Sequence, residues 1–306
     1  MLSQQRPDTN TAIEPPWFDR PDALALNAAS SARQDVKAYA RELITDGVCV
    51  VREAIAHELC DRVIADYAEY CARNPNGVKR DTLGRETRVV NFHRTSEASS
   101  AMGTNPELMT LLDYMFGMEA CLYTSLTFKY GTQQPIHRDT PHFGTWPQGY
   151  YFGVWVAMED VHDDAGPLML HRGAHRFAMQ QGAIMDELAR ENPEWSPEQL
   201  ADVALRKFCD EVMSRSLEQF GPPEFLPVRK GDVIVWHPEL PHGGSLAKNP
   251  HLTRWSTVFH CAPVAVQVHQ HQTFFRHRSP EAPPARYGYI DFQGRKVAVA
   301  GDTGFA

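Results

Sequence analysis

Three residues of this 306-residue chain have the types and the spacing of a metal site. His137 and Asp139 stand two positions apart in the segment QPIHRDTPHF, and His242 lies in the distant segment KGDVIVWHPELPHGGS. Side chains at positions i and i+2 of a strand share one face, so the imidazole and the carboxylate would point the same way. Two imidazoles and one carboxylate on one side of a metal leave further coordination positions open. The three residues therefore predict a metal centre able to take additional ligands.

His242 is the best candidate for the distal ligand, and His237 is its main competitor. Both follow the apolar run 233–236, which has the composition of a buried strand. Only His242 is bracketed by residues typical of a tight turn, namely Pro241, Gly243 and Gly244. A histidine taken alone is more often structural than metal-binding, but the pairing with His137 and Asp139 favours a ligand role for His242.

A cation follows on a later strand. Arg254 lies at the start of the segment TRWSTVFH, where its guanidinium would hold a carboxylate through two parallel hydrogen bonds. Ser256 falls on the same face of that strand and would add a hydroxyl donor. Thr140 and Lys129 are further candidates for binding the same anion. Trp155 either fills the core or walls that binding site.

The elements that must position these residues are mainly strands. Five short segments are rich in β-branched and aromatic residues and are separated by Gly, Pro or Asp turns: 119–130, 151–158, 166–170, 232–236 and 253–260. Residues 180–220 instead have helical periodicity, with Pro193 and Pro197 interrupting the run. The pattern predicts a mainly β, double-sheet core of the jelly-roll kind with one helical insertion.

Helices precede this core. Apolar residues recur at helical spacing from about residue 34 to Gly47 and again from 59 to 71, with a short strand at 48–51 between them. Asn105, Pro106 and Gly117 mark the ends of a third helix. We expect a flexible arm at 1–30 and one domain at 31–306, with a β core at about 119–262, the insertion at about 180–220 and a C-terminal extension at 263–306.

Bulk properties favour a small-molecule partner. The net charge is −8 and the isoelectric point about 5.9, which argues against nucleic-acid or anionic-membrane binding. No apolar run approaches the ~20 residues of a membrane span, and the opening residues do not resemble a secretion signal. Six cysteines are scattered without a C-x-x-C pair, so we expect reduced thiols and a cytoplasmic location.

The segment from Tyr123 to about His260 resembles the phytanoyl-CoA dioxygenase family of Fe(II)/2-oxoglutarate-dependent oxygenases. The family's His-x-Asp motif matches 137–139, its distal histidine matches His242 and its cosubstrate-binding arginine matches Arg254. Residues 154–176 are similar to the family's strand, acidic turn and Gly-Pro-Leu strand. One departure is the turn at 172–175, which reads Arg-Gly-Ala-His where the family often has Pro-Gly-Ser-His.

The resemblance implies a double-stranded β-helix and a catalytic Fe(II) held by His137, Asp139 and His242. It further implies that 2-oxoglutarate chelates the iron with its far carboxylate at Arg254, and that O₂ is consumed with release of succinate and CO₂. The expected outcome is hydroxylation of an aliphatic carbon of a small, anionic or polar metabolite. Desaturation, cyclisation and epimerisation begin with the same oxidant, whereas the carboxylate of Asp139 disfavours halogenation.

Two basic segments are candidates for the substrate pocket. Arg88, Asn91 and His93 alternate on an expected strand within 79–94, and Arg276 lies in the tail 269–280. They would suit an anionic or polyhydroxylated substrate, although such charge clusters usually form a solvated face. Two other functions stay open: a cupin-like isomerase or hydrolase using zinc or manganese, and a non-catalytic metabolite sensor. The isomerase or hydrolase leaves Arg254 without a specific role, and the sensor gives the three metal-binding residues no chemical purpose.

Overall fold

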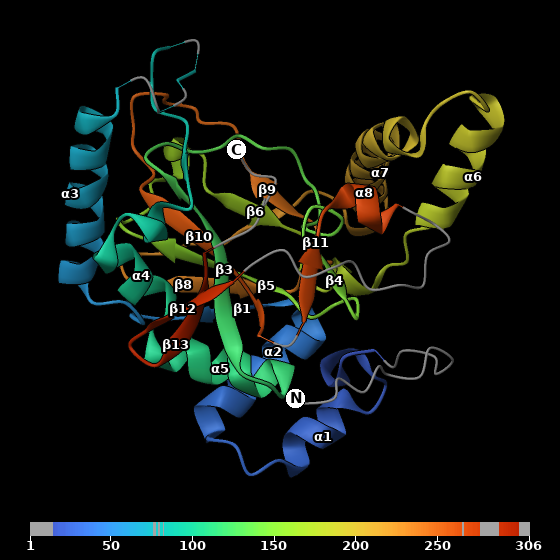
Figure 1. Ribbon diagram of the computed structural model, residues 1–306. Helices are drawn as coiled ribbons and strands as arrows, with labels where there is room; N and C mark the ends of the chain where they lie inside the picture. The colour runs from blue at the N-terminus through green and yellow to red at the C-terminus, as the bar shows by residue number, and fades with distance from the viewer. Residues whose placement is uncertain are drawn as a thin grey trace, which may run out of the picture.

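The computed structural model describes residues 15–75, 78, 80–81, 83–264, 266–275 and 288–299. Its largest element is an eight-stranded sheet of order β1-β8-β5-β10-β3-β13-β12, in which β2 additionally pairs with β3 (Figure 1). The bounds are β1 Val48–Val51, β2 Val89–Val90, β3 Ala120–Phe128, β5 Phe152–Ala157, β8 Val233–Trp236, β10 Ser256–Pro263, β12 Tyr289–Phe292 and β13 Arg295–Ala298. The predicted strands at 119–130, 151–158, 232–236 and 253–260 are confirmed.

A second layer of short strands packs on one face of this sheet. It contains β6 (Leu168–Leu170), β7 (Glu224–Phe225) and β9 (His242–Gly244) in the order β7-β6-β9, and the separate pair β4 (Gly144–Trp146) and β11 (Gln267–His269). Buried residues from both sheets form one apolar cluster, including Trp155, Leu170 and Val258. The predicted double-sheet core is therefore confirmed.

Helices cover the other face of the large sheet (Figure 1). They are α1 Ala23–Ala29, α2 Gln34–Asp46, α3 His57–Arg73, α4 Glu97–Gly103 and α5 Pro106–Phe116. The ends of α5 are as predicted, because the Asn105 side chain accepts hydrogen bonds from two backbone amides of the first turn and Gly117 takes a left-handed φ of 65°. Their apolar faces and the sheet bury the largest core cluster, which includes Leu43, Val63 and Leu112.

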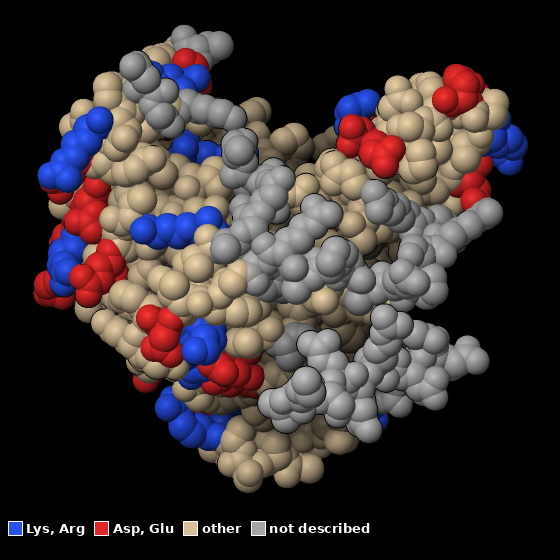
Figure 2. All heavy atoms as spheres, in the orientation of Figure 1, with Lys and Arg blue, Asp and Glu red and all other residues tan. Residues whose placement is uncertain are grey.

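The helical insertion forms α6 (Gln181–Glu191) and α7 (Pro197–Phe220), and α7 packs against the short helix α8 (His271–Phe274). Ser196 and Gln199 form a capping box at the start of α7. The α6–α7 pair projects from one side of the sheets, and the surface is hollowed beside it (Figures 1 and 2). Four 3₁₀ turns complete the described elements: Trp17–Asp19, Phe92–Arg94, Asp163–Ala165 and Ala174–Arg176.

Residues 15–30 are not a loose arm, because Phe18 and Ala23 are buried and Trp17 Nε1 donates a 2.7 Å hydrogen bond to the Met115 carbonyl; residues 1–14 lie outside the described residues. Within the predicted C-terminal extension, β13 pairs with β3 and so joins the large sheet. No helix among the described residues is long and apolar enough to cross a bilayer.

Candidate active site

His137 and His242 are paired directly through their backbones. Each donates its amide hydrogen to the other's carbonyl oxygen at 2.9 Å, which forms an isolated antiparallel bridge, and the ring centroids lie 4.5 Å apart. On its other side His242 pairs with Leu170 of β6. Pairing of chain segments within the smaller sheet is thus what brings together two residues that are far apart in the sequence.

Gly243 and Gly244 allow β9 to lie close against the segment before His137, and they do not form the predicted tight turn. Gly243 and Gly244 belong to strand β9. A Cβ atom on Gly243 would lie 2.7 Å from the Gln134 carbonyl oxygen, and one on Gly244 would lie 2.5 Å from Thr132 Oγ1. A side chain at either position would push the segment before His137 away from β9.

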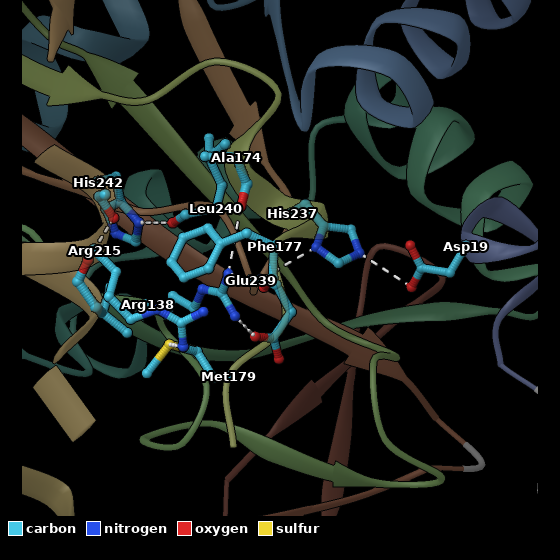
Figure 3. A network of polar contacts seen from close by, with 12 residues as sticks. Asp19, Arg138, Ala174, Phe177, Met179, Arg215, His237, Glu239, Leu240 and His242 are labelled. Carbon is cyan, nitrogen blue, oxygen red and sulfur yellow. Dashed lines mark hydrogen bonds and ion pairs between the residues drawn. The ribbon is translucent and has the colours of Figure 1, made fainter. Parts of the chain in front are cut away.

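Backbone carbonyls fix the orientation of both imidazoles. His137 Nδ1 donates to the Pro135 carbonyl and His242 Nδ1 donates to the Leu240 carbonyl, each at 2.9 Å (Figure 3 draws the second of these). Burial lowers the pKa of His137 to about 3 and that of His242 to about 4, so both rings are neutral near pH 7. With Nδ1 protonated, Nε2 of each ring keeps the lone pair that a metal ion needs.

Asp139 completes the group through one carboxylate oxygen. Its Oδ2 accepts a 2.8 Å hydrogen bond from Trp236 Nε1, while Oδ1 lies 3.7 Å from His242 Nε2. Single donor atoms of His137, Asp139 and His242 all lie within 4.8 Å of one another. Two imidazole nitrogens and a carboxylate oxygen at these separations suit a divalent transition-metal ion such as Fe(II), so these three residues fit the expected iron.

Arg138 lies between His137 and Asp139 in the sequence, but its side chain points away from the metal-binding group. It is 3% exposed, pairs with Glu239 at 2.9 Å and donates to the Phe177 carbonyl at 2.7 Å (Figure 3). Its guanidinium also lies 4.0 Å from the centre of the Phe177 ring. The ion pair ties the segment that carries Asp139 to the loop that leads into His242.

His237, the competing candidate, has other partners. Its Nε2 donates to Asp19 Oδ2 at 3.2 Å, and its Nδ1 accepts from the Glu239 amide at 3.2 Å (Figure 3). Both nitrogens are thereby occupied away from Asp139. The structure brings together His137, Asp139 and His242 and leaves His237 outside this group.

The three donor residues face a cavity of about 240 Å³ between the two sheets. Its walls come from four strands of the large sheet, from β6 and β9, and from the segment 132–143. The lining residues include Arg88, Leu126, Phe128, Thr132, Gln134, His142, Phe143, Trp155, Leu168, Trp236, Arg254, Val258 and His260. The metal-binding group therefore opens into a space large enough for small-molecule ligands.

Arg254 is a buried cation in the wall of this cavity. Its side chain is among the largest fully enclosed ones, Nη1 donates to the Gly166 carbonyl at 2.8 Å, and Nε has no partner among the described residues. The guanidinium lies 5.6 Å from the centre of the Trp155 ring. Burial lowers the pKa of Arg254 to about 10, so it remains charged near pH 7. Since no described carboxylate pairs with it, the site favours an anionic ligand.

The other predicted anion-binding residues lie outside the described cavity lining. The Ser256 hydroxyl donates back to the Arg254 carbonyl at 3.3 Å. Thr140 is buried, and its amide donates to the Pro238 carbonyl. The Lys129 ammonium instead lies over the rings of Tyr130 and Trp255, at 5.5 and 5.9 Å.

Of the predicted substrate residues, only Arg88 lines the cavity. The expected strand ends at Val90 because Asn91 takes a left-handed φ of 55°, which breaks the alternation. Asn91 Oδ1 then accepts from the Thr124 hydroxyl at 2.5 Å, and His93 Nδ1 lies 2.6 Å from the Ser125 hydroxyl. Both side chains fasten this segment to β3 and lie outside the described cavity lining. Arg276 lies outside the described residues.

Sequence reasoning did not assign several polar and aromatic residues of the cavity lining, among them Gln134, Trp236 and His260. Gln134 Nε2 lies 3.1 Å from His137 Nε2. A period-two reading from Arg254 along its strand would have placed His260 on the same face. Trp236 carries no such signal, because its bond to Asp139 depends on how β8 and the segment 137–139 meet.

Comparisons with known proteins agree with this geometry. A family model described as "Phytanoyl-CoA dioxygenase (PhyH)" matches residues 44–256. No curated protein matches the chain. Among solved structures, the epimerase SnoN in complex with Fe³⁺, alpha ketoglutarate and nogalamycin RO is 17% identical, with a TM-score of 0.59 over 86% of this chain and 98% of that one. The alpha ketoglutarate-dependent carbocyclase SnoK is 15% identical, with a TM-score of 0.58 over 83% and 94%. EctD from S. alaskensis with bound Fe is 15% identical, with a TM-score of 0.58 over 83% and 86%. At these identities the likeness shows a shared fold.

Proposed function

Because the chain belongs to the phytanoyl-CoA dioxygenase family of Fe(II)/2-oxoglutarate-dependent oxygenases, we propose that it hydroxylates an aliphatic carbon of a small anionic metabolite. In this reaction one oxygen atom of O₂ enters the substrate and the other enters succinate, as 2-oxoglutarate loses CO₂. The observation that carries the proposal is the unneutralised guanidinium of Arg254 in the same cavity as His137, Asp139 and His242.

The metal ligands in this proposal are Nε2 of His137, Nε2 of His242 and Oδ1 of Asp139. Support comes from the backbone carbonyls that accept hydrogen bonds from both Nδ1–H groups, which keeps each Nε2 free, and from Trp236, which donates to the second carboxylate oxygen. When bound, iron and 2-oxoglutarate supply the activation of O₂ that oxidises the substrate. The protein's contribution is to hold the three donors on one side, which leaves room for the cosubstrate.

Arg254 binds the far carboxylate of 2-oxoglutarate in this proposal. Its unpartnered Nε and its buried charge are suited to a carboxylate, and Phe128, Leu168 and Val258 supply apolar cavity walls. A charge-assisted hydrogen bond is stronger where water is excluded. The carboxylate would thus be placed by electrostatics while Trp155 limits its movement.

Arg88 is the group that points to an anionic substrate. It is the exposed cation of the cavity lining, and Asp139 is the only acidic residue among the described lining residues. Since Asp139 is assigned to the metal, an incoming anion meets no opposing charge in the lining. Figure 2 shows the cations over α3 interspersed with acidic side chains, which suits a small ligand better than a nucleic acid.

The two alternative functions explain fewer features of the cavity. A zinc or manganese isomerase or a metabolite sensor would use the same three donors, but neither needs a buried cation beside them.

We also propose a cytoplasmic location, which is supported by six unpaired cysteines, four of them buried.

The proposal is tested by succinate release. Purified protein with Fe(II), O₂ and 2-oxoglutarate is screened against small carboxylates, phosphates and phosphonates, and the products are weighed by mass spectrometry. We expect an anion to accelerate succinate formation and to gain one oxygen atom. Loss of two hydrogens would indicate desaturation or cyclisation, and an unchanged mass would indicate epimerisation. No succinate with any compound, under conditions where metal binds, would contradict the oxygenase activity.

A further inference from the structure

The cavity extends from Arg254, two residues before strand β10, to His260 within that strand. Arg254, Val258 and His260 stand at even spacing along this segment, and all three line the cavity. At the rise of an extended chain, the Cα atoms of Arg254 and His260 are roughly 20 Å apart. The two residues therefore mark opposite ends of the site, and 2-oxoglutarate at Arg254 leaves the His260 end to a second molecule.

His260 stands in a row of residues that crosses the large sheet. It pairs with Gly153 of β5 on one side and Thr124 of β3 on the other, and Gly153 pairs in turn with Trp236 of β8. A Cβ atom on Gly153 would lie 2.3 Å from Trp236 Cε2, so the indole lies over the glycine. Trp236 Nε1 also donates a hydrogen bond to Asp139. This row of residues therefore places His260 beside the metal-binding group, although His260 is not one of its members.

The imidazole of His260 is held rigidly and has no polar partner. It is 2% exposed and packs against the rings of Phe143 and Tyr151, with centroid distances of 4.1 and 5.5 Å. Its Nδ1 is enclosed without a hydrogen-bond partner among the described residues. Burial lowers the pKa of His260 to about 4, so the ring is neutral and offers one donor and one acceptor.

A structural role does not account for these features. A phenylalanine would fill the same space beside Phe143, Tyr151 and Val258 without burying the unpaired Nδ1 atom. An imidazole in a cavity wall becomes satisfied when a ligand supplies the missing partner. Two further polar groups belong to the same lining, the imidazole of His142 and the exposed, charged guanidinium of Arg88.

We propose that His260 recognises the substrate by hydrogen bonding to a polar substituent, such as a hydroxyl group, of an anion whose charge is met by Arg88. The substrate class is thus a small organic anion with a second hydrogen-bonding group. This inference rests on the proposed function, because it assigns the other end of the cavity to 2-oxoglutarate.

The test uses matched pairs of aliphatic carboxylates that differ only in one hydroxyl group. The readout is substrate-stimulated succinate release. For wild type we expect a preference on the order of 100-fold in kcat/KM for the hydroxylated compound of at least one pair, because the compound without the hydroxyl group leaves the imidazole unpaired. In His260→Phe, which keeps the ring stacking, the preference should fall to within about tenfold. His260→Gln, which restores a donor and an acceptor, should recover part of it.

His171→Phe is the matched control. His171 is also buried with an unpartnered Nε2, but it lies outside the described cavity lining, so the wild-type preference should persist. A wild-type preference that survives in His260→Phe, or equal stimulation by both members of every pair, would overturn the role of His260. Failure of the proposed function is seen separately, as the absence of Fe(II)/2-oxoglutarate binding in wild type, and it would remove this role as well.

Discussion

The indole Nε1 of Trp236 lies 2.8 Å from Oδ2 of Asp139 and joins the end of β8 to the carboxylate of the metal-binding group. The bond is buried, so water does not compete for either partner. It leaves Oδ1 directed to the side of His242, whose Nε2 lies 3.7 Å away. Trp236 thus determines which carboxylate oxygen is available to a metal ion.

Trp236→Phe should weaken Fe(II) binding by about 10- to 100-fold, because losing a partner of a ligating carboxylate has effects of this size. The phenyl ring keeps most of the packing over Gly153. The measurement is anaerobic Fe(II) titration. Trp17→Phe is the control, since it removes another indole hydrogen bond, to the Met115 carbonyl, far from the cavity. Equal iron affinities in Trp236→Phe and wild type would show that Asp139 is held by other contacts.

Gly153→Ala should produce a similar loss by moving the indole. The added Cβ would lie 2.3 Å from Trp236 Cε2, a distance that forces the ring off the strand. We expect weaker Fe(II) binding together with a change in tryptophan fluorescence, and no further loss of iron affinity when Trp236→Phe is combined with it. Additive effects of the two substitutions on iron affinity would rule out a shared cause.

Arg254→Met should lower the affinity for 2-oxoglutarate by roughly 100-fold or more, since two charge-assisted hydrogen bonds contribute about 3 kcal/mol together. Without cosubstrate, the variant should resist urea as well as wild type or better, because a buried charge lacking a counterion is replaced by an apolar chain. Arg254→Lys keeps the charge but loses the planar guanidinium, so its affinity for 2-oxoglutarate should lie between those of wild type and Arg254→Met. Unchanged 2-oxoglutarate binding in Arg254→Met would move the anion site elsewhere.

His93 should make folding stability depend on pH. Burial lowers its pKa from 6.5 to about 3, so the unfolded chain takes up a proton first as the pH falls. This contribution to stability is fully present well above pH 6.5 and is lost as the pH falls, with a slope that approaches about 1.4 kcal/mol per pH unit below the unfolded pKa. In urea unfolding between pH 6.5 and 5.5, His93→Asn should therefore lose less stability than wild type by about 1 kcal/mol, because the unfolded histidine is already half protonated at pH 6.5. The exposed His251→Asn serves as control, and identical slopes in His93→Asn and wild type would refute the assignment.

The sequence was sufficient for features encoded locally. The β-branched and aromatic residues of 119–130 and 253–260 predict β3 and β10, and His137 and Asp139 lie on one short segment whose spacing alone places them together. Asn105 and Gly117 predict the ends of α5 because capping depends on residues within one turn.

Features that depend on strand register were not predictable in the same way. The row that joins Trp236, Gly153 and His260 exists only once β8, β5 and β10 pair in a particular alignment. The period-two reading of 79–94 was wrong for a local reason, since one left-handed residue, Asn91, ends the strand and turns His93 toward β3. Ser256 shares a strand face with Arg254, but a shared face does not decide which residues reach a cavity.

The central claim is tested most directly by anaerobic titration of the metal-free protein with Fe(II) and 2-oxoglutarate, followed by visible absorption. A 2-oxo acid that chelates Fe(II) through two oxygens gives a weak charge-transfer band, and no substrate is needed. We predict that wild type forms the band and that His242→Ala and Asp139→Ala do not, because each loses a metal ligand. Failure of wild type to form the band, with metal binding unaffected by 2-oxoglutarate, would contradict the assignment of this cavity to iron and 2-oxoglutarate.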